Sequence, residues 1–359
     1  MPRIIAVGTA VPPYELRQIE ARQFAKRLFG ETFPGIERLL KIFENTAIAT
    51  RYVSKPLEWF EREHSFQEKN EAYVETACRL GAEAIQRCLA QTDIALDEID
   101  HLLVVSTTGM ATPSLDARLI NYLGLRNNVK RTPIWGLGCA GGAAGLARAA
   151  AFAKACPGDR VLLVAIECCS LTFRRQDRSK SNLVATSLFG DGAAAVLVTE
   201  GTGEARSDGV YWEVTDAASY CWPDSLDVMG WDFMDDGLKV IFSRDIPTLI
   251  KQEVKGVLEP FLATHQLTVP RLDRLFMHPG GKKVLEAYEE ALGMFPDKLA
   301  SAYRVLKQYG NMSSATVLFV LEQDLRRQPL LSGERGLLAA LGPGFSLEMV
   351  LLQAKGGER

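Results

Sequence analysis

The chain has 359 residues, 47% of them hydrophobic and 24% charged, which is typical of soluble globular proteins and excludes a disordered chain. A formal net charge of −3 provides no basic surface for nucleic acid. Because the N-terminus lacks a signal-peptide core and no apolar stretch reaches roughly 18 residues, we expect a cytoplasmic protein with no membrane span. The length suits about two domains.

Seven cysteines stand at positions 78, 88, 139, 156, 168, 169 and 221. Their number is odd, and none forms the paired C-x-x-C spacing of a zinc site. The sequence therefore predicts neither a disulfide framework nor a bound metal.

In the first half, continuous apolar runs predict buried parallel strands separated by helices, the pattern of an α/β protein. These runs cover residues 101–109, 131–138 and 159–167. Between the last two, Cys139 opens an alanine-rich helix over 140–155, which Pro157 and Gly158 end. A strand over 189–198 closes this half.

The second half follows a similar order. Strands are predicted over 273–281, 334–344 and 341–352, and helices over 282–292 and 312–325. Asn311 opens the second of these helices, as Cys139 opens the helix of the first half. We interpret this order as an internal duplication that brings both residues to one shared cavity. The polar segment 200–209 is the expected joint, which gives halves of 1–205 and 206–359.

Cys139 stands among residues that have almost no side chain: Gly138, Ala140, Gly141 and Gly142. A helix N-terminus favours a thiolate over a thiol, because the helix dipole and the free amides stabilise negative charge. The small neighbours are expected to leave open space for a substrate carbonyl. Alternatively, Cys139 is simply a small apolar residue in a tight turn.

Among four histidines, His278 alone ends an apolar strand and precedes a turn, at the carboxyl end of the strand, where α/β proteins build sites. A purely structural histidine would also fit this position. Asn311 could likewise serve only as a helix cap. Together, the three residues favour a Cys-His-Asn site.

The motifs GLGCAGG, LFGDGAA, HPGG, YGNMSSA and GPG occur in the order seen in type III polyketide synthases, and the chain resembles these chalcone synthase-like enzymes of the thiolase superfamily over nearly its whole length. The resemblance implies a five-layered αβαβα fold of two duplicated halves, working as a homodimer. It also implies that Cys139, His278 and Asn311 form the catalytic site. Acyl-CoA and malonyl-CoA would be the substrates, with no permanently bound cofactor and no metal.

These residue types suit that chemistry. A thiolate both attacks a thioester and leaves again, and His278 is expected to stabilise it as an ion pair. Decarboxylation of malonyl-CoA places negative charge on the thioester oxygen, to which His278 and Asn311 would donate.

The resemblance also assigns substrate-binding positions. Phe189 matches an aromatic gatekeeper, Cys169 and Thr172 match cavity-lining positions, and Glu167 matches a buried supporting carboxylate. Val240 stands where plant members have a second gatekeeper phenylalanine. Leu341, followed by Gly342 and Pro343, replaces another ring. We expect a roomier cavity for long-chain acyl starters, and hence alkylpyrone or alkylresorcinol synthesis, unless neighbouring residues refill both gaps.

For coenzyme A, the resemblance implies phosphate contacts from Arg38 and Lys41, one helical turn apart, and contacts from Gly280 and Gly281. Arg51 and Lys55 are weaker candidates. A solvated helix face explains the charges of Arg38 and Lys41 nearly as well.

Three alternatives to this function stay open. The chain could make 1,3,6,8-tetrahydroxynaphthalene from malonyl-CoA alone, since bacterial members can have a cysteine near position 169. It could be a ketoacyl synthase III-like enzyme, which shares the three catalytic residue types. It could also be a non-catalytic acyl-CoA-binding homologue.

Overall fold

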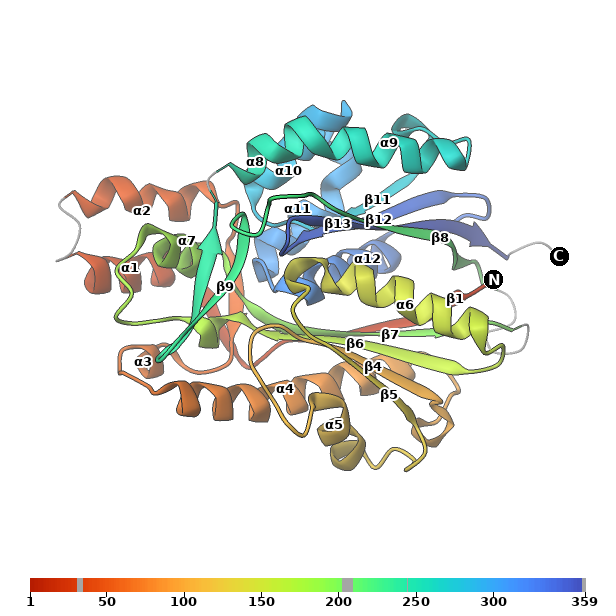
Figure 1. The fold of residues 1–359 in the computed structure, drawn as a ribbon, viewed down its shortest axis with the longest axis horizontal. Helices are drawn as coiled ribbons and strands as arrows, with labels where there is room; N and C mark the ends of the chain where they lie inside the picture. The colour runs from red at the N-terminus through yellow and green to blue at the C-terminus, as the bar shows by residue number, and fades with distance from the viewer. Residues whose placement is uncertain (31–34, 202–208, 244, 357–359) are drawn as a thin grey trace.

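Strands and helices stack in five layers in the computed structural model, which describes residues 1–30, 35–201, 209–243 and 245–356 (Figure 1). The strands are β1 Arg3–Ala10, β2 Tyr14–Arg17, β3 Thr50–Val53, β4 His101–Val105, β5 Lys130–Ile134, β6 Arg160–Cys168, β7 Asp191–Thr199, β8 Tyr211–Cys221, β9 Met229–Met234, β10 Gly237–Phe242, β11 Arg274–Met277, β12 Arg335–Gly342 and β13 Ser346–Lys355. The helices are α1 Gln18–Phe29, α2 Ile36–Asn45, α3 Leu57–Phe60, α4 Phe66–Leu89, α5 Leu115–Leu123, α6 Gly141–Ala155, α7 Lys180–Leu188, α8 Ile246–Leu249, α9 Lys255–Thr264, α10 Lys282–Leu292, α11 Ala300–Tyr309 and α12 Thr316–Arg327.

The main sheet has the strand order β11-β12-β13-β8-β1-β7-β6-β4-β5. Strands β5, β4 and β6 run parallel, as do β11 and β12, which confirms the predicted α/β character. The two halves of the sheet meet where β1 pairs with β8 through Arg3–Glu213 and Ile4–Trp212. In Figure 1, α4 and α5 cover one outer face, and α8, α9 and α10 cover the other.

Helices α6 and α12 form the middle layer, between the two halves of the sheet (Figure 1). Each is entered through a 3₁₀ turn, at Gly138–Ala140 and Ser313–Ala315 respectively. The expected correspondence between the corners of Cys139 and Asn311 is therefore present. Much of the expected joint, residues 202–208, lies outside the described residues, together with the boundary at 205.

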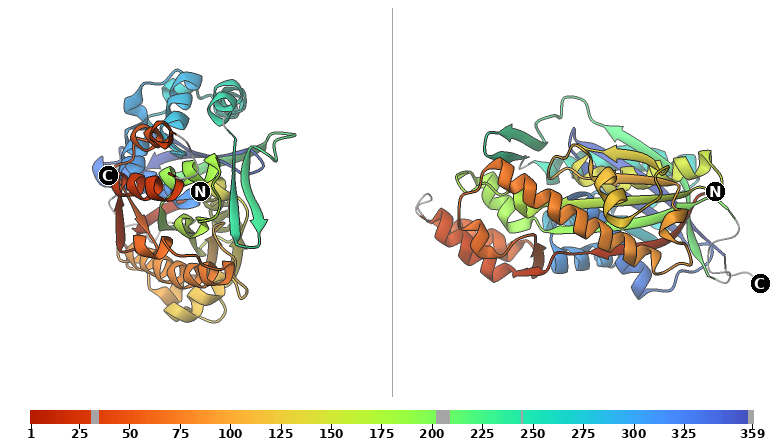
Figure 2. Two further views of the ribbon diagram at one scale, coloured as in Figure 1. Left: turned by 90° about the vertical axis from the view of Figure 1, so that its left-hand side faces the viewer. Right: turned by 90° about the horizontal axis from the view of Figure 1, so that it is seen from below.

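Two two-stranded sheets extend beyond the main sheet. In one, β2 and β3, which are separated in the chain by α1 and α2, pair Leu16 with Arg51; in the other, the β9–β10 hairpin pairs Trp231 with Val240. Figure 2 shows the β9–β10 hairpin running along one side of the layers. Residues of both small sheets, of α1 and of α7 line one pocket.

Across the described ranges, no helix combines the length and apolar character needed to cross a membrane. The same residues contain no cluster of three histidine, cysteine or acidic side chains placed to hold a metal ion.

Candidate active site

Cys139 lies in the 3₁₀ turn that leads into α6, and its side chain is partly exposed. Its sulfur is 3.9 Å from Oδ1 of Asn311. Gly138 lies in this turn with a φ of +47°, which disfavours other residues. Its amide donates to Oγ1 of Thr107 at 3.1 Å. The structure therefore brings the predicted nucleophile and the predicted amide to one corner.

The small residues beside Cys139 do not leave open space, so that expectation is wrong. A Cβ at Gly142 would lie 2.2 Å from the backbone oxygen of Ser314, and one at Gly141 would lie 2.6 Å from Val105. Because packed interiors cannot absorb such overlaps, these glycines are needed for close approach of α6 to the turn before α12. They position the nucleophile and do not make room for substrate.

Asn311 is fully buried and fixed on both sides of its peptide unit. Its amide donates to the carbonyl of Leu188 at 2.9 Å, and its carbonyl accepts from the amide of Gly190 at 3.0 Å. Its side-chain Oδ1 accepts from the amide of Ser313, and Nδ2 donates to the carbonyl of Gly280 at 3.2 Å. Since Nδ2 carries two hydrogens, the bond to Gly280 leaves one of them unused.

His278 follows β11, and its amide donates to the carbonyl of Ala339. The residue is 3% exposed, and neither ring nitrogen has a hydrogen-bond partner among the described residues. Its sequence neighbours Gly280 and Gly281 lie at the start of α10, where Gly280 holds Asn311. The imidazole is thus buried in the same region with both nitrogens available.

The predicted ion pair between Cys139 and His278 is absent from this structure. Desolvation raises the pKa of Cys139 to about 11, although its hydrogen bonds with Ser313 and Asn311 act in the opposite direction. Burial also lowers the pKa of His278 to about 3. Desolvation therefore acts against the charged form of both groups and opposes the stabilisation of a thiolate by the helix N-terminus.

Glu167 lies at the carboxyl end of β6 and connects both corners. Its Oε2 accepts from the amide of Thr107 and the hydroxyl of Thr108, and its Oε1 accepts from the hydroxyl of Ser314 at 2.5 Å. Burial raises its pKa to about 7 despite these bonds. The contacts fit the predicted supporting role.

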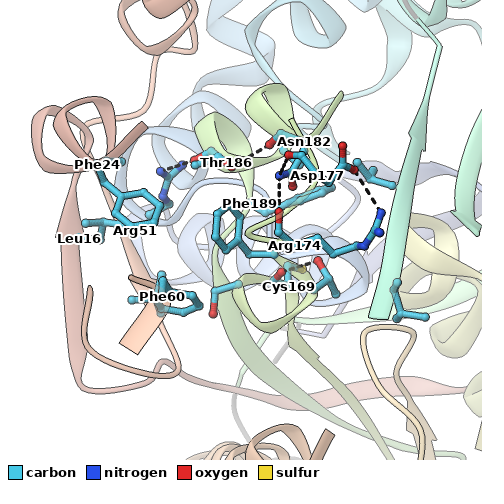
Figure 3. Close-up of a pocket in the computed structure, with 18 of the residues that line it drawn as sticks. Leu16, Phe24, Arg51, Phe60, Cys169, Arg174, Asp177, Asn182, Thr186 and Phe189 are labelled. Carbon is cyan, nitrogen blue, oxygen red and sulfur yellow. Dashed lines mark hydrogen bonds and ion pairs between the residues drawn. The ribbon is translucent and has the colours of Figure 1, made fainter. Parts of the chain in front are cut away.

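Beside this corner lies a pocket with about 630 Å³ of empty space, part of it open to solvent (Figure 3). Four predicted substrate residues line it: Cys169, Thr172, Phe189 and Val240. Much of the remaining wall is apolar and comes from distant segments, namely Leu16, Ala21, Phe24, Val53, Leu57, Phe60, Phe173, Ala185, Trp231 and Leu238. Sequence reasoning missed these residues, because no local motif marks them.

Phe189, the predicted gatekeeper, is half-buried at the end of α7. The ring of Trp231 lies 6.1 Å from it, and Trp231 pairs with Val240 across the hairpin. The ring of Trp231 therefore stands next to Val240, where plant members have a phenylalanine. Trp231 fills part of the space that the missing ring would leave, and a pocket remains beside it.

Residues Leu341, Gly342 and Pro343 are not among those lining this pocket. Leu341 is 3% exposed and belongs to the core. A Cβ on Gly342 would lie 2.5 Å from Ala140, and one on Gly138 would lie 2.6 Å from the Pro343 ring. Gly342 and Pro343 thus pack against the turn that carries Cys139.

Arg38 and Lys41 are exposed on α2, where a solvent-borne phosphate could reach them. Arg51, a weaker candidate for the same role, is 1% exposed and lines the pocket. It is therefore removed from the solvent-facing position that a coenzyme A phosphate would need.

The chain matches two family models, "Chalcone and stilbene synthases, N-terminal domain" over residues 2–202 and "Chalcone and stilbene synthases, C-terminal domain" over residues 213–355. It is 45% identical over 361 residues to a Bacillus subtilis (strain 168) protein named "Putative chalcone synthase", covering 99% of both chains. It is 39% identical over 353 residues to the 1,3,6,8-tetrahydroxynaphthalene synthase of Streptomyces peucetius subsp. caesius, covering 98% of this chain and 92% of that one.

Solved structures agree with this likeness. The 1,3,6,8-tetrahydroxynaphthalene synthase of Streptomyces coelicolor A3(2), described as a bacterial type III polyketide synthase, superposes with a TM-score of 0.92 at 30% identity, over 98% of this chain and 99% of that one. A structure of CsyB complexed with CoA-SH superposes with a TM-score of 0.90 at 28% identity, over 99% of this chain and 100% of that one. The five layers, the two matched family models and this agreement show that the chain belongs to the chalcone and stilbene synthase family of type III polyketide synthases, which are acyltransferases with the thiolase fold.

Proposed function

We propose that this enzyme condenses a long-chain aliphatic acyl-CoA starter with malonyl-CoA and releases alkylpyrones or alkylresorcinols. The observation that carries the proposal is the mainly apolar pocket whose wall includes Phe189, Cys169, Thr172 and Val240. Binding pockets for apolar groups gain affinity by removing that surface from water. An alkyl chain matches this wall better than a polar starter does.

In the proposed cycle, Cys139 attacks the starter thioester and releases coenzyme A, while the neutral His278 accepts the thiol proton. Malonyl-CoA then loses carbon dioxide, and the negative charge on its thioester oxygen is stabilised by donors from His278 and Asn311. The resulting enolate attacks the acyl group on Cys139, and the sulfur leaves as a thiolate. Among the residues that the structure describes, both ring nitrogens of His278 and one amide hydrogen of Asn311 have no competing partner, which supports these roles.

Coenzyme A is proposed to approach along α2, with its phosphates at Arg38 and Lys41. The exposure of both side chains on one helix supports this assignment. We also propose, on the resemblance alone, that the enzyme works as a cytoplasmic homodimer.

Val240→Phe tests the starter assignment. The added ring should restrict the pocket and lower kcat/KM for palmitoyl-CoA about 10- to 200-fold relative to butyryl-CoA, the range expected when a hydrophobic pocket is reshaped. Lys239→Phe adds the same ring to the opposite face of β10 and should leave this ratio unchanged. Thermal unfolding must accompany the kinetics, because overpacking costs about 1 to 3 kcal/mol of stability.

Synthesis of 1,3,6,8-tetrahydroxynaphthalene from malonyl-CoA alone is the second candidate, favoured by the names of two similar relatives. The wild-type enzyme with malonyl-CoA as its only substrate separates the two. A naphthalene product without added starter, combined with no turnover of palmitoyl-CoA, would replace the fatty-acyl assignment.

A further inference from the structure

Arg51 is a charged side chain enclosed in an apolar wall. It belongs to β3, pairs with Leu16 of β2 and is 1% exposed. Leu16, Phe24, Val53 and Phe60 line the same pocket. In the view of Figure 3, Arg51 lies beside Phe24, and Phe189 stands between it and Cys169. In that view, Arg51 and the cavity-lining Cys169 lie on opposite sides of Phe189.

The protein satisfies this guanidinium only in part. Nη2 donates to the carbonyl of Thr186 at 2.6 Å, whereas Nη1 is buried and has no hydrogen-bond partner among the described residues. Burial lowers the pKa of Arg51 to about 10, so the group stays cationic at neutral pH. An unpartnered charged donor in an apolar wall is costly, and such groups are usually paired.

The nearby carboxylate does not supply the missing partner. Asp191 attracts Arg51 electrostatically, but it is fully buried and its two oxygens accept from Ser54 and Ser170, through both the amide and the hydroxyl of each. A second pocket arginine shows the usual arrangement. Arg174 pairs with Asp177 and Asp236. Of these two pocket arginines, Arg51 is the one with an unused donor.

The stem of Arg51 is held against the catalytic corner. Its Cβ would lie 3.2 Å from a Cβ on Gly190 and 3.5 Å from one on Gly310, the glycines that follow Phe189 and precede Asn311. Gly310 has a φ of +69°, which other residues rarely adopt. The guanidinium is therefore presented from a fixed backbone, so little freedom is lost when it binds a ligand.

We propose that Nη1 of Arg51 binds an oxygen atom of the acyl chain in the pocket. The proposal rests on the proposed function, in which this pocket holds the chain. Two sources can supply such an oxygen: a carboxylate at the far end of the starter, or a ketone introduced by malonyl-CoA extension. Both are hydrogen-bond acceptors, and a guanidinium has only donors.

Arg51→Met tests the assignment, because methionine keeps much of the stem and removes the donors. Lauroyl-CoA and the mono-CoA thioester of dodecanedioic acid have equal length and differ in the terminal carboxylate. If the oxygen comes from the starter, Arg51→Met lowers kcat/KM for the carboxylated starter relative to lauroyl-CoA by about 10- to 100-fold, the value of a hydrogen bond to a charged group. If it comes from the growing chain, this ratio is unchanged and lauroyl-CoA products carry fewer extensions by mass spectrometry.

Arg27→Met is the control, since it removes an exposed, paired arginine outside the pocket and should change neither the starter ratio nor the product length. If Arg51→Met does not fold, Arg51→Lys carries the test, because it keeps the charge opposite Asp191 and loses the fork of donors. A folded variant with unchanged starter ratio and unchanged product length overturns the proposal. Failure of the wild-type enzyme to use either starter overturns the proposed function instead, and the length of products from malonyl-CoA alone then tests Arg51.

Discussion

The corner formed by Cys139, Asn311 and Glu167 and the neighbouring pocket are built on opposite principles. At the corner, glycines allow backbones to touch, and Asn311 and Glu167 are held by several hydrogen bonds each. The pocket wall is mainly apolar and comes from small sheets and helices outside the central layer. In the proposed function, the chemistry therefore depends on a rigid interior, whereas the choice of substrate depends on peripheral elements. Changes at the corner should affect all starters alike, and changes in the pocket should alter their ratio.

Cys139→Ala should have the largest effect. Removing the sulfur eliminates acyl transfer, so polyketide formation should fall at least about a thousandfold with every starter. Intact-protein mass spectrometry after incubation with acyl-CoA should show no adduct. Cys221→Ala, a change at an exposed cysteine, should keep both the adduct and the turnover. An adduct that persists in the Cys139 variant would move the nucleophile elsewhere.

Replacing the two donors should separate their roles. Losing one oxyanion donor typically costs about 100- to 1,000-fold in rate. His278→Ala should slow both loading of Cys139 and release of carbon dioxide from malonyl-CoA, while Asn311→Ala should mainly slow the latter. Single-turnover acylation and labelled carbon dioxide release measure the two steps. Small and equal losses would indicate structural roles.

Glu167 predicts a pH dependence of stability. Its pKa in the folded protein, about 7, lies above the ordinary value of 4.5, so the native state retains a proton that the unfolded chain releases. Its contribution is complete below pH 4.5 and is lost as the pH rises through 7. In Glu167→Gln, the difference in the free energy of unfolding between pH 4.5 and pH 7 should shrink by up to about 3 kcal/mol, as measured by denaturant unfolding across that range. Parallel slopes in both proteins would refute the shift.

Gly142→Ala tests how tightly the corner is packed. The new methyl group would meet Ser314, and overpacking of this kind costs about 1 to 3 kcal/mol. Gly256→Ala is the control: Gly256 is exposed in α9 with nothing near its Cβ position, so alanine there should stabilise the helix by up to about 1 kcal/mol. Thermal unfolding of both variants gives the comparison. Equal melting temperatures of the two variants would show that the surroundings of Gly142 can shift to accommodate the added methyl group.

The corner could largely be predicted from the sequence because its information is local. Short motifs around Cys139 and Asn311, each directly before a helix, indicated the two equivalent turns. The state of the thiol could not be predicted, since the helix N-terminus is visible in the sequence and the surrounding desolvation is not. The purpose of the glycines was misread for the same reason: Ser314 is distant in the chain and adjacent in space.

The pocket was less predictable. Phe189, Cys169, Thr172 and Val240 followed from a family resemblance, but Phe24, Phe60 and Trp231 come from segments whose pairing only the fold reveals. Arg51 was only a weaker candidate for coenzyme A contact. Its burial depends on the pairing of β3 with β2 and on its contact with Thr186 of α7, a tertiary arrangement that charge patterning does not encode.

The backbone at Phe189 constrains how this part of the pocket wall can move. The amide of Phe189 donates to the carbonyl of Ala185, and the amides of Gly190 and Asn311 donate to the carbonyls of Asn311 and Leu188. The segment therefore cannot swing as a loop without breaking the isolated bridge between Phe189 and Asn311. In the proposed gatekeeper role, Phe189 would act by rotation of its phenyl ring about its own bonds, a motion far faster than lid opening. Such a rotation would leave the backbone hydrogen bonds of Asn311 intact.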